Sequence, residues 1–568
     1  MNDQSNMMQS TQNRWRHATL VIVFFLLAYL LPIGFRDLLV PDETRYAEIP
    51  REMIATGQWG VPHLNGLRYF EKPPLGYWVH AGSLLIFGEN NFAVRLPSAL
   101  AVGLMALLIF ALVRRSVGNA SDGHGIAGIL AALVFLSCFE VAGVGNMATL
   151  DSVFTLLLTL TILAFYCATE KPPGSAAEKH YLLLSGIACG LSFLTKGFLA
   201  VVLPVIVLVP YLVWQRRYID MLRMSWRPLL TATVVALPWG WYIQLKEPDF
   251  WHYFFWIEHI QRFMADSAQH KEPFWFYFVA APVLFLPWSF VTPAAVPGLR
   301  KIAKDAGPRG RLARFSICWL LLPFLFFSVS NGKLLTYILP CFPPFAVLAS
   351  LGLMRNHPPG KHRIFAWGAA ATFACFILIL LSLVWIQIFS YQGFRPYSQP
   401  WKAMMVINGL FFMVLFCFWS LRNPDGVNKV VLLGLAPLMF LFVVHFAVPD
   451  VAIEQSVPER LLEKNLNKIK RNDIIISCEE AVGAACWALK RNNVYLLGPA
   501  GELTYGLGYQ DGSGRLLNVN SAARLITKNQ GHIAIIARAD KARGLRQALP
   551  APFFEDDSGP DGYVFYRY

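Results

Sequence analysis

The feature that most constrains this chain is a succession of long apolar runs separated by short charged loops. Of its 568 residues, 55% are hydrophobic and only 15% are charged, whereas a soluble protein carries about a quarter charged residues. A helix of about 20 apolar residues crosses the hydrocarbon core of a bilayer. The pattern therefore predicts an α-helical integral membrane protein.

The apolar runs predict about thirteen spanning helices. Several runs are shorter than roughly 20 residues, so their helices must extend into the flanking residues or tilt less. The first run follows Arg14, Arg16 and His17 and no small-x-small cleavage site comes after it, which predicts an uncleaved anchor. The predicted spans lie near 17–35, 92–113, 124–145, 151–169, 181–195, 198–214, 228–244, 274–296, 315–330, 334–352, 363–389, 403–421 and 429–448.

The distribution of basic residues predicts the orientation of these helices. The net charge of +14 could suggest a nucleic-acid partner, but Lys and Arg are concentrated in alternate short loops, with about 21 on one side and about seven on the other. This is the bias of cytoplasmic loops, so we expect no nucleic acid and a cytoplasmic N-terminus. An odd number of spans then places the C-terminus outside.

The predicted division is a transmembrane domain at 1–448 and a small soluble α/β domain at 449–568, outside the membrane. Strands are expected at 474–476, 494–497, 532–537 and 563–567. Two outer loops are expected at 36–91 and 245–274. The first is too long to be a simple turn, and long structured loops are usually functional. Cys478 and Cys486 form the only plausible disulfide pair, and the other seven cysteines are interpreted as packing residues in apolar segments.

The first outer loop carries an acidic pair, Asp42 and Glu43, followed by Arg45 and Glu48 one helical turn apart. Asp42 follows a proline and suits the N-cap of an interfacial helix with solvated charges. Alternatively, the pair lies at the membrane surface, where a lipid-linked substrate would react. Downstream, Lys72 is suited to binding a phosphate, as is Arg45, although membrane anchoring would also explain a lysine there.

Further charged residues occur where other apolar segments reach the outer side. Asp151, Lys196 and Lys333 could be helix caps, snorkelling lysines or members of a site. The aromatic segment 249–275 carries His252, His259 and Arg262, and it is typical of an interfacial helix. A divalent metal, either zinc or magnesium/manganese, held by Glu71 with His252 or His259 is a weaker hypothesis.

These motifs together resemble one family, the undecaprenyl phosphate-4-amino-4-deoxy-L-arabinose transferases of lipid A. Several separate loops agree with it in order, across essentially the whole membrane part, and the likeness is weaker in the tail. Leu335 departs from the proline that is common in relatives. The matching segments are Asp42 to Glu48, Glu71-Lys72-Pro73-Pro74, Thr195 to Phe198, Phe254 to Phe263 and Gly332 to Pro340.

The resemblance implies a membrane glycosyltransferase of the GT-C type in the inner membrane of a Gram-negative bacterium, with its active site and C-terminal domain in the periplasm. The donor would be undecaprenyl phosphate-linked aminoarabinose and the acceptor a lipid A phosphate, giving resistance to polymyxin and cationic peptides. The enzyme would act among membrane lipids, as a monomer. Its expected catalytic residues are Asp42, Glu43 and Asp151, and its expected substrate-binding residues are Arg45, Tyr46, Lys72, Lys196, His259, Arg262, Lys333 and Tyr337.

Two other functions remain open from the sequence. A related GT-C enzyme, such as a protein O-mannosyltransferase, would share the acidic pair but use a hydroxyl or amide acceptor. A lipid transporter or flippase would belong to a different class, but transporters tend to show paired halves and breaks in mid-membrane, and this sequence shows no such halves. The absence of a nucleotide-binding motif is consistent with an activated lipid as donor.

Overall fold

The computed structural model describes residues 15–117, 126–261, 271–355, 363–391, 393–559 and 561–568. The chain forms two compact units. The helical unit contains residues 1–32, 98–390 and 404–445, and the mixed unit contains residues 33–97, 391–403 and 446–568.

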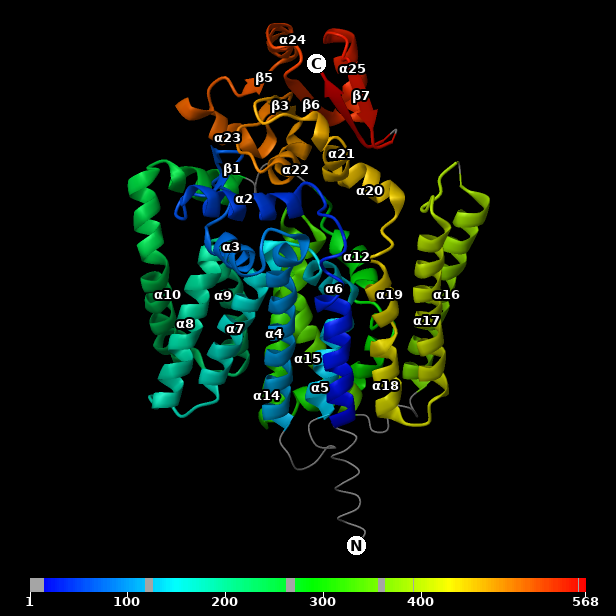
Figure 1. Ribbon diagram of the computed structural model, residues 1–568. Coiled ribbons are helices and arrows are strands. Elements are labelled where there is room, and N and C mark those ends of the chain that lie inside the picture. The colour runs from blue at the N-terminus through cyan, green and yellow to red at the C-terminus, as the bar shows by residue number, and fades with distance from the viewer. Residues whose placement is uncertain (1–14, 118–125, 262–270, 356–362, 392, 560) are drawn as a thin grey trace. The chain divides into compact units, whose positions relative to one another are not determined.

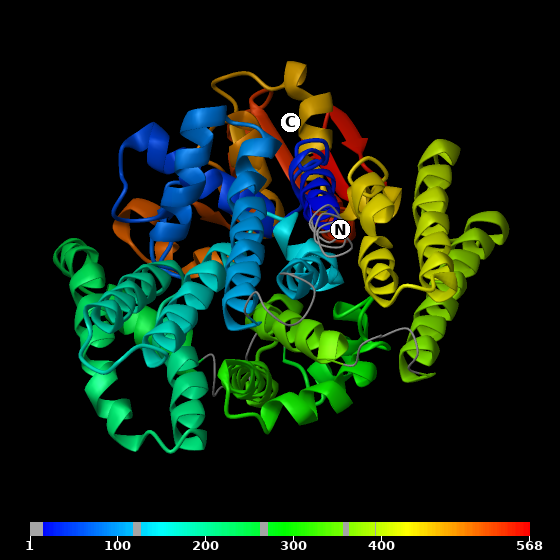
Figure 2. The ribbon, with the colours of Figure 1, turned by 90° about the horizontal axis from the view of Figure 1, so that it is seen from below.

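The helical unit consists mainly of long helices that run side by side (Figure 1), and Figure 2 looks along most of them. The first helix, Trp15–Leu30, ends in the π-helical turn η1 (Leu26–Leu30). The others are α4 (Asn91–Val117), α5 (Ile126–Ser137), α6 (Phe139–Gly145), α7 (Leu150–Thr169), α8 (Ala176–Lys196), α9 (Leu199–Trp214), α10 (Tyr218–Lys246), η2 (His252–Gln261), α12 (Phe276–Leu284), η3 (Thr292–Ala295), α13 (Val296–Ala303), α14 (Pro308–Val329), η4 (Leu335–Cys341), α15 (Phe342–Arg355), α16 (Arg363–Phe389), α17 (Pro400–Arg422), α18 (Gly426–Leu435) and α19 (Leu438–Val443). The first turns of α4 and α17 belong to the mixed unit.

The number of spans differs from the prediction. By length and apolar composition, seven helices among the described residues are able to cross a membrane, or up to eight if the bent pair α5 and α6 is one span. Every predicted range contains helix, but a count of thirteen is not confirmed. The prediction of a continuous helix at 274–296 is wrong, because α12 ends at Leu284 and the chain then turns until η3. Pro287 lies three residues beyond this end and cannot donate a helical hydrogen bond.

Glycines allow two of these helices to pack closely. A Cβ atom at Gly186 of α8 would lie 2.6 Å from the carbonyl oxygen of Pro228, and one at Gly190 would lie 2.8 Å from that of Ala232, both in α10. Small residues at such positions let helix backbones approach each other, which is a common packing mode in membranes.

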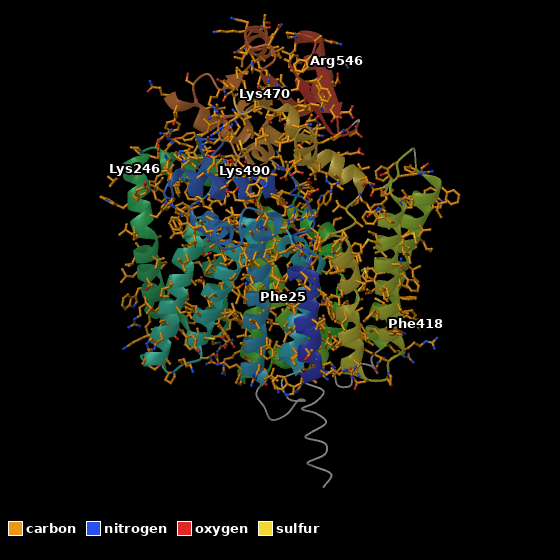
Figure 3. All side chains as sticks on the ribbon, viewed as in Figure 1. Phe25, Lys246, Phe418, Lys470, Lys490 and Arg546 are labelled. Carbon is orange, nitrogen blue, oxygen red and sulfur yellow. The ribbon has the colours of Figure 1, made fainter. Side chains whose placement is uncertain are left out.

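Charged side chains of the helical unit lie near the helix ends, whereas the middles of the helices carry mostly carbon (Figure 3). At one end, Arg223 donates to Glu178 at 2.6 Å and to Asp220 at 2.7 Å. In the same group of basic loops, Arg311 donates to Glu170 at 2.7 Å. These are the loops whose basic residues predict a cytoplasmic side.

The mixed unit is built around a six-stranded sheet with the strand order β5-β4-β3-β6-β8-β7. Strands β3, β4, β5 and β6 are parallel, and β8 and β7 are added antiparallel. The strands are β3 (Ile474–Ser477), β4 (Tyr495–Leu497), β5 (Leu516–Leu517), β6 (Ile533–Arg538), β7 (Phe554–Asp557) and β8 (Tyr563–Arg567), and the helices between them include α22 (Glu479–Leu489), α24 (Val519–Lys528) and α25 (Ala539–Ala548). The predicted α/β character of the tail is confirmed.

The first outer loop belongs to the same compact unit as this sheet. The predicted domain boundary at residue 448 had assigned the loop to the transmembrane domain instead. The loop contains α2 (Asp42–Thr56), the hairpin β1 (His63–Leu64) and β2 (Leu67–Arg68), and α3 (Leu75–Phe87). Helix α2 packs against α22 so closely that a Cβ atom at Gly483 would lie 3.1 Å from Thr44 Oγ1. The Asn65 side chain makes two hydrogen bonds to the backbone of Val494. Its Oδ1 accepts from the Val494 amide at 2.9 Å, and its Nδ2 donates to the Val494 carbonyl oxygen at 2.8 Å.

The predicted disulfide between Cys478 and Cys486 does not form in the structure, where both residues are free thiols and buried. Cys478 precedes α22, whereas Cys486 lies two turns into it. Cys486 Sγ instead donates to Asn65 Oδ1 at 3.4 Å, so its thiol is used in packing the first loop against the tail.

Candidate functional site

Helix α2 presents Asp42 at its first position. The N-cap is Pro41, not Asp42 as predicted, and it makes no side-chain capping bond. A carboxylate in the first turn of a helix is stabilised by the helix dipole. The Asp42 side chain is 49% exposed, so its carboxylate remains accessible to a ligand.

Arg45 holds Asp42 in place, one helical turn along α2. Its guanidinium donates to the Asp42 carboxylate and also to Glu502, and it donates to the Tyr69 hydroxyl at 2.7 Å. The Tyr69 hydroxyl in turn donates to Glu502 at 2.7 Å. Although burial raises the pKa of Glu502, the charge of Arg45 and the Tyr69 hydrogen bond hold it below its ordinary value. We call Asp42, Arg45, Tyr69 and Glu502 the Asp42 network, a hydrogen-bonded cluster within the mixed unit.

This network changes the role expected for Arg45. The sequence predicted that Arg45 binds a substrate phosphate, but its guanidinium is buried and paired with two carboxylates. The geometry favours a positioning role, in which Arg45 fixes the Asp42 carboxylate. Sequence reasoning missed Glu502, which lies 457 residues from Arg45 in a tail without a motif.

Glu43, the neighbour of Asp42, has a different environment. It is completely buried, and Arg95 of α4 donates to both of its oxygens, at 2.7 and 2.9 Å. Arg36 and the backbone amide of Leu39 also donate to it, at 3.2 and 3.0 Å. Burial raises the pKa of Glu43, but the two guanidinium groups outweigh this effect and lower it to about 2. The geometry favours a structural role for Glu43 over the predicted catalytic one, because both of its oxygens are paired and it has no exposed surface.

Lys72, Glu71 and Tyr46 also lie in the mixed unit. The Lys72 ammonium donates to its neighbour's carbonyl oxygen, Glu71 O, at 2.8 Å and lies 3.9 Å from the Glu71 carboxylate. It also contributes to lowering the pKa of Glu502, which shows that its charge acts on the Asp42 network. The guanidinium carbon of Arg45 lies 5.4 Å from the centre of the Tyr46 ring. The predicted substrate-binding residues Tyr46 and Lys72 therefore both border this network.

A second group of predicted residues meets within the helical unit. Lys196, the last residue of α8, donates to Asp151 in the first turn of α7. The Lys196 ammonium also lies 4.8 Å from the centre of the Tyr337 ring and 5.8 Å from that of Phe154, in cation–π contact with both. We call Asp151, Lys196 and Tyr337 the Asp151 cluster.

The remaining predicted residues are less informative. Lys333 is buried, and its ammonium donates to the carbonyl oxygens of Ser330 and of Glu272, the latter at 2.7 Å, so it is satisfied by backbone. His252 is exposed at the start of η2. The side chain of His259 and the whole of Arg262 lie outside the described residues.

The structure leaves the metal hypothesis open. Within the described ranges, no group of three or more His, Cys, Asp or Glu residues is arranged to hold a metal ion. Glu71 and His252 belong to different compact units, and a site of these two ligands stays a prediction.

Comparison with known proteins gives two family matches along the chain. Residues 15–254 match the model for dolichyl-phosphate-mannose-protein mannosyltransferases, and residues 453–566 match the model for the C-terminal domain of the arabinosyl transferase ArnT. In solved structures, the chain resembles ArnT from Cupriavidus metallidurans. The apo state matches with a TM-score of 0.81 and 23% identity, and the match covers 98% of both chains. The state bound to undecaprenyl phosphate matches with a TM-score of 0.80 and 22% identity, over 96% of this chain and 97% of the other. These likenesses confirm the GT-C fold.

Full-length relatives identify the family more closely. The undecaprenyl phosphate-alpha-4-amino-4-deoxy-L-arabinose arabinosyl transferase of Shewanella sediminis is 37% identical over 97% of this chain and 98% of its own length. The enzyme of the same name from Aeromonas salmonicida is 39% identical over 93% and 95%. Since the agreement extends through both the helical part and the tail, the chain belongs to the family of undecaprenyl phosphate-alpha-4-amino-4-deoxy-L-arabinose arabinosyl transferases.

Proposed function

We propose that this protein transfers 4-amino-4-deoxy-L-arabinose from undecaprenyl phosphate to a phosphate group of lipid A, on the periplasmic side of the inner membrane. The observation that carries the proposal is the Asp42 network, in which Arg45 holds a half-exposed carboxylate on the outer loop. Tyr69 and Glu502 in turn hold Arg45. The resulting lipid A would carry an added positive charge, which lowers its affinity for polymyxin and other cationic peptides.

The reaction forms one bond and breaks one. The sugar's C1–oxygen bond to the donor phosphate breaks, and C1 forms a new bond to an oxygen of the acceptor phosphate. The leaving group is polyprenyl phosphate, whose developing negative charge requires a preorganised cation. Lys72 is suited to this role, since its ammonium is a compact point charge on the outer loop beside the Asp42 network.

Asp42 needs no proton-accepting role in this chemistry. A phosphate monoester has a second pKa near 6, so the acceptor is largely ionised at neutral pH and is already a nucleophile. A hydroxyl acceptor would need a general base instead. The Asp42 carboxylate, fixed by Arg45, is therefore assigned to orienting the substrates.

Protein mannosylation is the second candidate, since residues 15–254 match the mannosyltransferase model. The tail argues against it, because residues 453–566 match the C-terminal domain of an arabinosyl transferase. A flippase would move the lipid without breaking a glycosidic bond, so an assay of product formation separates it from both enzymes.

The test is transfer by the purified protein in liposomes, with radiolabelled sugar donors. We expect product from undecaprenyl phosphate-aminoarabinose with lipid A, and none from dolichyl phosphate-mannose with an acceptor peptide. Mannosyl transfer, or no cleavage of either donor, would contradict the proposal.

Lys72→Ala should lower the rate on the order of a hundredfold, because it removes charge stabilisation from the leaving group. Lys470→Ala, which changes an exposed lysine of the same unit (Figure 3), is the matched control.

The periplasmic orientation has its own test. A reporter fused after Tyr568 should be active in its periplasm-dependent form and inactive in its cytoplasm-dependent form, because the Lys/Arg bias of the loops predicts a cytoplasmic N-terminus. A fusion truncated in the basic loop after Arg311 should show the opposite pattern. Cytoplasmic activity at Tyr568 would mean that the number of spans is even.

A further inference from the structure

A buried carboxylate of the helical unit has no role in the reaction described so far. Glu140 lies at the start of α6, directly after the 68° bend that separates α6 from α5. The bend is fixed by the amide of Phe139, which donates to the carbonyl oxygen of Leu286 at 3.1 Å. Glu140 is only 6% exposed, and its Oε1 atom has no hydrogen-bond partner among the described residues.

Glu140 faces the Asp151 cluster. Helix α6 packs against α7, α12 and η4, which carry Asp151, Tyr277 and Tyr337. The Glu140 carboxylate interacts electrostatically with Asp151, and the Tyr277 side chain interacts with both carboxylates and with Tyr337. The two carboxylates therefore act on each other electrostatically. Lys196 pairs with one of them, Asp151.

Among the described residues, the Glu140 carboxylate has no paired cation of its own beside the Asp151 cluster. An unpaired carboxylate removed from water is strongly destabilising, and a second carboxylate nearby increases the cost. A cationic ligand would relieve both effects. A calcium ion takes six to eight oxygen ligands, more than two carboxylates supply, whereas an ammonium group donates three hydrogen bonds and suits two carboxylates.

We infer that Glu140, together with Asp151, binds the ammonium group of the amino sugar and thereby selects an amino sugar over a neutral one. This inference rests on the proposed function. The sugar's amine is the only cationic group among the substrates, because the polyprenyl phosphate and the lipid A phosphate are both anionic. Glu140 is accordingly a specificity residue, distinct from the groups that stabilise the leaving phosphate.

The experiment compares two donors that differ only in the substituent on the sugar nitrogen, the charged amino sugar and its uncharged N-formyl derivative, each on undecaprenyl phosphate. Glu140→Gln keeps the size of the side chain but removes its charge. A hydrogen bond between two charged groups contributes about 1.5–3 kcal/mol, so we expect kcat/KM for the amino donor to fall about tenfold to a hundredfold. Transfer from the formylated donor should change less than about threefold, since that contact carries no charge pair.

Several outcomes decide the inference. Equal losses with both donors would assign Glu140 a structural role and overturn it, as would an unchanged preference for the amino donor. Glu140→Asp, which keeps the charge, should retain part of the preference, and Asp305→Asn, an exposed carboxylate of the same unit, should retain all of it. If Glu140→Gln fails to fold, the wild-type protein still tests the inference, because equal kcat/KM for the two donors would overturn it. Failure of the wild-type protein to transfer either sugar would instead contradict the proposed function.

Discussion

Asp42→Asn should abolish sugar transfer while leaving the protein folded. The substitution keeps the shape of the side chain but removes the charge that Arg45 holds at the start of α2. Loss of a preorganised charged group at a reacting centre costs on the order of a hundredfold or more in rate. The effect on stability should be small, about 0–1 kcal/mol, because an ion pair with a half-exposed partner contributes little and Arg45 keeps its second carboxylate partner, Glu502.

The measurements are transfer by the purified variant and polymyxin resistance in a null strain, both normalised to the amount of protein in the membrane. Asp540→Asn is the matched control, because Asp540 also lies exposed in the first turn of a helix, α25, and pairs with a nearby arginine, Arg538, at 3.6 Å. It should leave both readouts unchanged. Full resistance from well-expressed Asp42→Asn protein would show that the active carboxylate lies elsewhere.

Glu43→Gln should give the opposite result, a protein that fails to accumulate in its folded form. The substitution leaves Arg95 buried with its charge uncompensated. Breaking a buried ion pair by removing one partner costs about 3–5 kcal/mol, a large part of the 5–15 kcal/mol that stabilises a typical domain. The measurements are membrane abundance and protection of the mixed unit from protease. A Glu43→Gln protein of normal abundance and protection would contradict the role assigned to this ion pair.

The same ion pair predicts an acid-labile unit. The pKa of Glu43 is lower in the folded protein, about 2, than its ordinary value of 4.5. The folded state is therefore stabilised above pH 4.5, and this contribution is lost as the pH falls from about 4.5 towards 2. The melting temperature of the wild-type protein should therefore fall across this window, as protonation of Glu43 removes the charge that pairs with Arg95.

These two carboxylates show where sequence reasoning ends. Asp42 and Glu43 are adjacent and equally acidic, and nothing in their spacing separates a reactive group from a structural one. The structure separates them because Arg95, 52 residues further along the chain, occupies both oxygens of Glu43. Asp42 pairs with Arg45 instead and remains half exposed.

The strands of the tail also differ in how far the sequence predicted them. Four of its strands were predicted, because their buried faces give continuous apolar runs. The strand β7 (Phe554–Asp557) was missed, since it reads Phe-Glu-Asp-Asp and lies at the edge of the sheet, where charged residues are common. The two-residue strand β5 is too short to show any periodicity.

The sequence by itself determined that this protein spans a membrane, which loops are charged and which family it belongs to. All three follow from local composition and from motifs that are continuous in the chain. The tertiary structure alone decided that Arg45 is held by Glu502, that Glu43 is a buried anchor and that Glu140 faces Asp151. Glu502 and Arg45 are 457 residues apart, and Glu140 lies within an apolar run. Such roles depend on burial and on the charges nearby, and both are set by folding, not by sequence neighbours.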